Sequence, residues 1–141
     1  MIEAVAKLVY PCAIVLGIAL WAKSAGAVGD GFSAGAVASV GAVVQFVCLD
    51  HDHAARVTGA RWAWVYVAAG LGVVLTVSLA PVFYGLPPVW HVPRPGAHVG
   101  SFSLLKFHTA MLFDMGVAVL VYGAVVGSFD RIFPPLRGDS P

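Results

Sequence analysis

The chain has 141 residues, of which 60% are hydrophobic and only 11% are charged, and its formal net charge is +1. A soluble domain carries about 25% charged residues, so this chain has too few polar side chains to cover a surface in water. The composition excludes a soluble catalytic domain and predicts an integral membrane protein that is not an enzyme. The small net charge gives no indication of a nucleic-acid partner.

Four apolar segments are near the length of about 17–25 residues that a membrane-spanning helix needs. Because they lack the alternation of apolar and polar residues typical of barrel strands, the predicted fold class is an all-α integral membrane protein. We expect one domain, 1–141, that ends in a flexible tail, 129–141. The four transmembrane helices are expected at about 4–22, 31–50, 62–84 and 104–128.

Lysine and arginine in the short loops predict how the chain is oriented, because cytoplasmic loops carry an excess of these residues. An even number of helices places both termini on one side of the membrane. That side would carry Lys7, Arg56, Arg61, Arg131 and Arg137, against Lys23, Arg94 and Lys106 on the other. The distribution favours both termini in the cytoplasm.

Polar or helix-breaking residues interrupt the first two apolar segments, and a polar loop follows the second. Pro11 is expected to kink or break the first helix near Tyr10, and Gln45 is expected to hydrogen-bond to a neighbouring helix. The run 50–53, Asp-His-Asp-His, has ligand types that suit zinc, but four consecutive residues cannot all point at one ion. We therefore expect a solvated turn there, and we predict no metal site and no cofactor.

Glycines mark the faces on which the second and fourth predicted helices pack. On a helical wheel of 3.6 residues per turn, the three glycines of the fourth helix fall within about 40° of each other. Small residues at such spacings let membrane helices approach closely. The glycines singled out for helix packing are Gly31, Gly35, Gly41, Gly116, Gly123 and Gly127.

Asp114 is the one acidic residue in the apolar run 107–127. A carboxylate deep in a membrane costs at least about 2.5 kcal/mol by insertion scales, so something must offset this cost. Asp114 lies about three residues from the middle of this run. On the helical wheel it lies opposite the glycine face and on the same face as Ala118. We therefore expect protein on both sides of this helix, with the neighbour on the acidic side supplied by another subunit.

Other charged residues could accompany Asp114 in an ion path or serve as anchors. Lys7 could pair with Glu3, one turn before it, and snorkel to the membrane surface. Lys106 and His108 precede the fourth helix, where they could anchor it at the interface or form the outer end of a polar path to Asp114.

Two segments resemble one family of membrane proteins. The first is the turn and helix start at 29–38, GDGFSAGAVA, and the second is the run at 108–121, HTAMLFDMGVAVLV. Together they resemble the MnhB/MrpB subunit of the Mrp-type multisubunit cation/proton antiporters, in which a glycine is common where Asp30 stands. Thr109, Phe113, Asp114 and Gly116 match the pattern of that family.

The resemblance implies a small subunit of a large complex in the bacterial plasma membrane, with other antiporter subunits as its partners. Such a complex exchanges Na⁺ for protons and is driven by the proton gradient. Asp114 would then either line an ion path at a subunit interface or hold the subunit to a neighbour. The alternatives are a free-standing small dimeric proton-coupled transporter, and a purely structural subunit of a related hydrogenase-like or complex I-like assembly.

Overall fold

The computed structural model of the chain describes residues 1–23, 30–83, 85 and 109–133, and this part of the chain is helical. Four of its helices are long and apolar enough to cross a membrane, as the sequence predicts. In chain order, the helices are α1 (Ile2–Lys23), α2 (Gly31–Cys48), α3 (His51–Thr58), the short 3-10 helix η2 (Ala60–Trp62), α4 (Ala63–Phe83) and α5 (Thr109–Ile132).

The observed helix ends differ from the expected ones by a few residues. α2 ends at Cys48 rather than at 50, and α5 continues to Ile132, so residues 129–132 of the expected flexible tail are helical. Residues 104–108 and 134–141 lie outside the described part of the chain. Pro11 does not break α1, which runs through it.

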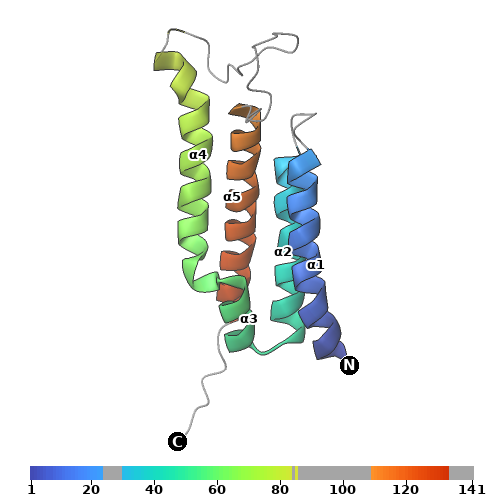
Figure 1. Cartoon of the computed structure of the whole chain (residues 1–141). Helices are drawn as coiled ribbons and strands as arrows, with labels where there is room; N and C mark the ends of the chain where they lie inside the picture. Colours follow the sequence, from blue (N-terminus) through green and yellow to red (C-terminus); the bar gives the residue numbers. More distant parts are fainter. Residues whose placement is uncertain (24–29, 84, 86–108, 134–141) are drawn as a thin grey trace, which may run out of the picture.

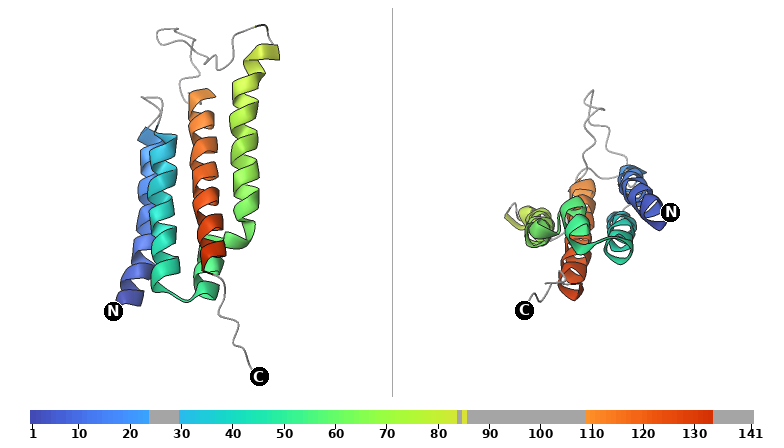
Figure 2. Two further views of the ribbon diagram at one scale, coloured as in Figure 1. Left: turned by 180° about the vertical axis from the view of Figure 1, so that it is seen from behind. Right: turned by 90° about the horizontal axis from the view of Figure 1, so that it is seen from below.

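The four long helices stand side by side in the order α1, α2, α5, α4 (Figures 1 and 2). α5 packs against both α2 and α4, while α1 packs chiefly against α2. The start of α1 and the last turn of α5 lie at the end of the bundle that also carries α3, which we call the α3 end (Figure 1). The last helix of the chain is therefore an inner element of the row.

The helix α3 stands where the sequence led us to expect a solvated turn. Asp50 is its extended N-cap residue, and Gly59 ends it in the left-handed conformation with φ 69°, which glycine adopts readily. Ala54 and Thr58 are the buried residues of this helix. The expectation of a turn at 50–53 is wrong, because α3 begins at His51, although Asp50 and Asp52 are exposed as expected. His51 lies 3.5 Å from Asp130 of α5.

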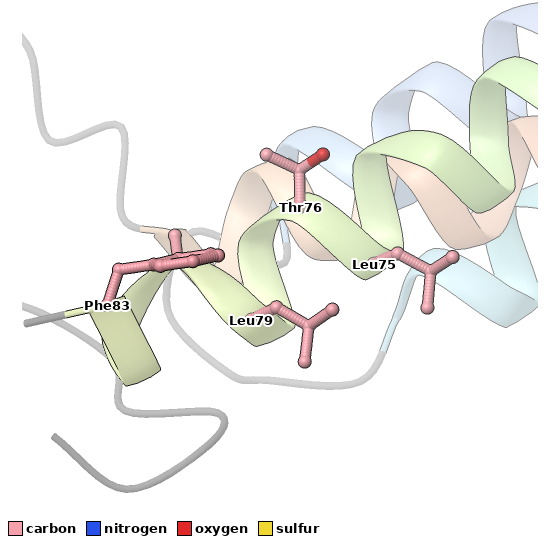
Figure 3. A pocket seen from close by; sticks show the side chains of 5 residues that line it. Leu75, Thr76, Leu79 and Phe83 are labelled. Atoms are coloured by element: carbon pink, nitrogen blue, oxygen red, sulfur yellow. The ribbon is translucent and has the colours of Figure 1, made fainter. Parts of the chain in front are cut away.

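The outer face of α4 is apolar and open. Leu75, Leu79 and Phe83 are 49%, 51% and 88% exposed, and with Thr76 they line a shallow hollow near the end of the helix (Figure 3). The Thr76 hydroxyl donates to the Gly72 carbonyl of its own helix at 2.7 Å, so it leaves no unpaired donor on this face. Such a surface is suited to hydrocarbon rather than to water.

Candidate functional site: a buried carboxylate between two helices

The glycine face of α5 packs on α4. A Cβ atom added at Gly70 of α4 would lie 2.6 Å from the Gly116 carbonyl oxygen, and one added at Gly123 would lie 2.7 Å from the Cβ of Tyr66. Gly127 faces Ala63 in the same way, at 3.1 Å. The two helices therefore approach closely along α5 because glycine leaves room at each crossing point.

The opposite face of α5, which carries Asp114, packs on α2. A Cβ added at Gly31 would meet the Asp114 backbone, 2.6 Å from its Cα, and one added at Gly35 would lie 2.6 Å from the Ala118 carbonyl oxygen. Both contacts advance by one turn on each helix. Asp114 is only 3% exposed. The expectation that another subunit supplies the neighbour on this face is therefore wrong: α2 of the same chain supplies it.

The place of Asp114 explains how the chain tolerates a carboxylate in an apolar helix. The residue is buried between two helices rather than in contact with hydrocarbon, and it lies beside Gly31, the first residue of α2. The contact with Gly31 is made by the backbone of Asp114. Burial between α2 and α5 keeps the residue out of hydrocarbon, where a charged side chain is costly.

Asp114 lies in the first half of α5. α5 extends from Thr109 to Ile132, so its midpoint falls between Leu120 and Val121. Asp114 is six to seven residues from this midpoint, or about 10 Å along the axis. The carboxylate belongs to the end of the bundle opposite α3.

Of the other charged residues expected near Asp114, the structure describes Lys7 alone. Gln45 of α2 donates a hydrogen bond from Nε2 to the Ala6 carbonyl of α1, so Lys7 lies at the level of Gln45, about 21 Å along α2 from Gly31. Lys7 is exposed, and the ion pair that the structure shows between two described residues joins His51 and Asp130. Lys106 and His108 lie outside the described residues, and Thr109 begins α5.

Two pairs of residues join α1 to α5. At the α3 end, the Tyr10 and Tyr122 hydroxyls lie 2.8 Å apart. At the Asp114 end, Trp21 Nε1 donates to the Met111 carbonyl at 3.2 Å. Eleven residues separate the two links on each helix, or about 16 Å.

Between these links, α1 and α5 leave a groove of about 500 Å³ whose floor is α2. The groove has space because four of its lining residues are small, namely Gly17, Ala34, Gly35 and Ala118. The other lining side chains are apolar except for Trp21, Tyr66 and Tyr122. A side-chain carboxylate or amide does not line it. The groove therefore offers an apolar surface rather than ligands for a cation.

The sequence did not lead us to expect a cluster of three tyrosines, Tyr10, Tyr66 and Tyr122. Tyr122 donates to the Thr58 carbonyl at 3.0 Å, and this uses its one proton, so Tyr10 must be the donor to Tyr122. The rings of Tyr66 and Tyr122 are 6.0 Å apart. The cluster joins α1, α5 and the α3–η2 corner. The available signal was a tyrosine inside an apolar run, whose hydroxyl needs a partner when it is buried.

These features define a multi-pass membrane protein in which small residues let the helices pack closely and a single acid is buried between two of them. Residues 1–127 match the family model described as a domain related to the MnhB subunit of the Na⁺/H⁺ antiporter. The chain belongs to this family, as the resemblance of its two segments predicted. The family is one of transporter subunits, and no curated protein matches the chain.

Proposed function

We propose that this chain is a small membrane subunit of a multisubunit Na⁺/H⁺ antiporter that is driven by the proton gradient. The match of residues 1–127 to the MnhB-related family is the observation that carries this proposal, and four helices able to cross a membrane support it. In this proposal the complex resides in the bacterial plasma membrane, with both termini of this chain in the cytoplasm. Other antiporter subunits are its partners.

Within the complex, we assign Asp114 a positioning role inside this chain. Its burial at 3% exposure and its contact with Gly31 support this assignment over a place on an outer surface. Asp114 holds the amino end of α2 against α5, and this fixes the pair of helices on which α1 and α4 pack. The apolar lining of the neighbouring groove also argues against a cation path on that side.

Membership of the complex is tested by purifying the tagged chain from its native membranes in a mild detergent. We expect other membrane subunits to co-purify with it. Membrane vesicles from cells that lack the chain should lose Na⁺-dependent collapse of an imposed pH gradient. Recovery of the chain as a lone homodimer that exchanges ions by itself would overturn the proposal and support the small dimeric transporter.

The role of Asp114 is tested by comparing two variants. Asp114→Asn keeps the shape of the side chain and one acceptor oxygen but removes the charge and replaces the second oxygen by an amide donor, whereas Asp114→Ala removes the polar group altogether. A positioning role predicts that the asparagine variant assembles and exchanges ions, while the alanine variant assembles poorly. An ion-handling role predicts instead that the asparagine variant assembles normally and exchanges no ions.

A further inference from the structure

A second groove, of about 710 Å³, lies between α4 and α5 at the α3 end. Its walls are apolar for most of their length, with Trp64, Val67 and Leu71 on α4 and Gly123, Ala124 and Gly127 on α5. The glycines that bring the two helices together also leave space beside the contact. The groove is open to the surroundings of the bundle, because Trp64 and Leu71 are 69% and 46% exposed.

One end of this groove is charged. Arg61 of η2 and Arg131 in the last turn of α5 line it, together with Asp130 and Ser128. Both arginines are exposed. Asp130 also lies 3.5 Å from His51 of α3. With two guanidinium groups and one carboxylate in the lining, this end of the groove has a net positive charge.

We propose that this groove binds an anionic phospholipid. The phosphate lies on Arg61 and Arg131, and one acyl chain runs along Val67 and Leu71 beside Gly123. Arginine matches phosphate oxygens with a planar fork of donors, and basic pockets between membrane helices are suited to anionic headgroups. Trp64 stands one turn from Arg61, at the level where tryptophan is enriched at membrane interfaces.

The length of the groove agrees with this occupant. Leu71 lies eight residues after Ala63, the first residue of α4, or about 12 Å along the helix axis, and Arg61 of η2 precedes this span. The groove is therefore close in length to one leaflet, which is half of the hydrocarbon thickness of about 30 Å. One acyl chain of one leaflet therefore extends from the arginines to the end of the groove. A free phosphate ion would use the arginines alone and would leave the apolar walls without a role.

The proposal is tested by native mass spectrometry of the full chain titrated with phosphatidylglycerol or with phosphatidylcholine carrying the same acyl chains. We expect phosphatidylglycerol to bind more tightly, and the Arg61→Gln/Arg131→Gln double variant to weaken that binding by about tenfold or more. Phosphatidylcholine binding should change little. Arg56→Gln is the matched control, because Arg56 is an exposed arginine of α3 at the same end but outside the groove.

The apolar half of the site is tested separately with Ala124→Phe, which fills the groove from an exposed position on α5. This variant should weaken the binding of both phospholipids by at least about fivefold, and millimolar inorganic phosphate should not displace phosphatidylglycerol from the wild-type chain. Helicity measured by circular dichroism shows that each variant is folded. If the double variant does not fold, Arg131→Gln alone should weaken phosphatidylglycerol binding severalfold.

Three results would overturn the proposal. The first is an arginine double variant that binds phosphatidylglycerol within twofold of the wild type. The second is an Arg56→Gln variant that loses as much affinity as the double variant, since binding would then follow the overall charge of this end. The third is displacement of phosphatidylglycerol by inorganic phosphate, together with unchanged phospholipid binding by the Ala124→Phe variant. The site would then bind phosphate and not a lipid.

Discussion

The two faces of α5 are packed in different ways. On the α4 side, α5 itself contributes glycines, and a glycine of α4 meets one of them at Gly70 and Gly116. On the α2 side, the glycines belong to α2, and Gly31 and Gly35 receive the backbone of Asp114 and Ala118. Close approach of two helices needs a glycine at each contact point, and this glycine can come from either helix.

The difference explains where an acid can be placed in such a bundle. The glycine face of α5 meets α4 through Gly116, Gly123 and the aliphatic Leu120, so it has no polar side chain at these contacts. On the α2 face, the residues of α5 keep their side chains because α2 contributes the glycines, Gly31 and Gly35, at the contacts. Asp114 is therefore buried at this face. The burial of Asp114 thus depends on the glycines of α2, and a substitution of those glycines should disturb the packing around Asp114.

The largest effect is expected from Gly31→Ala, which tests the α2 face. The added methyl group would overlap backbone atoms of Asp114, and backbone atoms cannot rotate away as the end of a side chain can. We expect the free energy of unfolding, measured by SDS titration in mixed micelles, to fall by about 3 kcal/mol or more. Phe32→Ala is the control, because Phe32 is the next residue and is 64% exposed. Equal losses in the two variants would contradict the packing described.

A somewhat smaller effect is expected from Gly70→Ala, which tests the α4 face. Its Cβ would lie 2.6 Å from both the Gly116 carbonyl oxygen and the Leu120 amide nitrogen, and we expect a loss of about 2–3 kcal/mol in the same titration. Gly72→Ala is the matched control on the same helix, since its added Cβ would have no atom within 4 Å. That control should be neutral or slightly stabilising, because alanine is the better helix former.

The smallest effect is expected from Tyr122→Phe, which removes the hydroxyl that links α1 to the α3–η2 corner. Two hydrogen bonds are lost, and hydrogen bonds inside membrane proteins contribute about 0.6 kcal/mol each on average. We expect a loss of about 1 kcal/mol, and less from Tyr10→Phe, which removes one bond. In the Tyr122→Phe background, Tyr10→Phe should cost almost nothing more. Full additivity of the two changes would show that the hydroxyls are not bonded to each other.

Hydropathy and the pattern of small residues predicted much of the fold from the sequence. Four long apolar runs required four spanning helices, and the spacing of Gly116, Gly123 and Gly127 placed them on one face of α5. The position of Asp114 opposite that face correctly implied protein on both sides. These predictions succeed because helical periodicity fixes which residues share a face, whatever the neighbours are.

The identity of the neighbours could not be predicted in this way. A wheel gives the direction of Asp114 but not the order of the helices in space, and the row α1, α2, α5, α4 places α2 where another subunit was expected. The helix α3 was also missed, because its eight residues are polar at the start and lie between two strong apolar runs. Asp50 before it and Gly59 after it are the helix-end residues that could have indicated it.

The most direct test of the account is the Na⁺/H⁺ exchange rate of the Asp114→Asn variant per assembled complex in membrane vesicles. If Asp114 positions α2 on α5 within this chain, the asparagine variant should assemble and exchange ions at a rate within about twofold of the wild type, since asparagine retains the shape of the side chain and one acceptor oxygen. A fully assembled complex that has lost at least tenfold in exchange would contradict the account and would assign the carboxylate to the ion path.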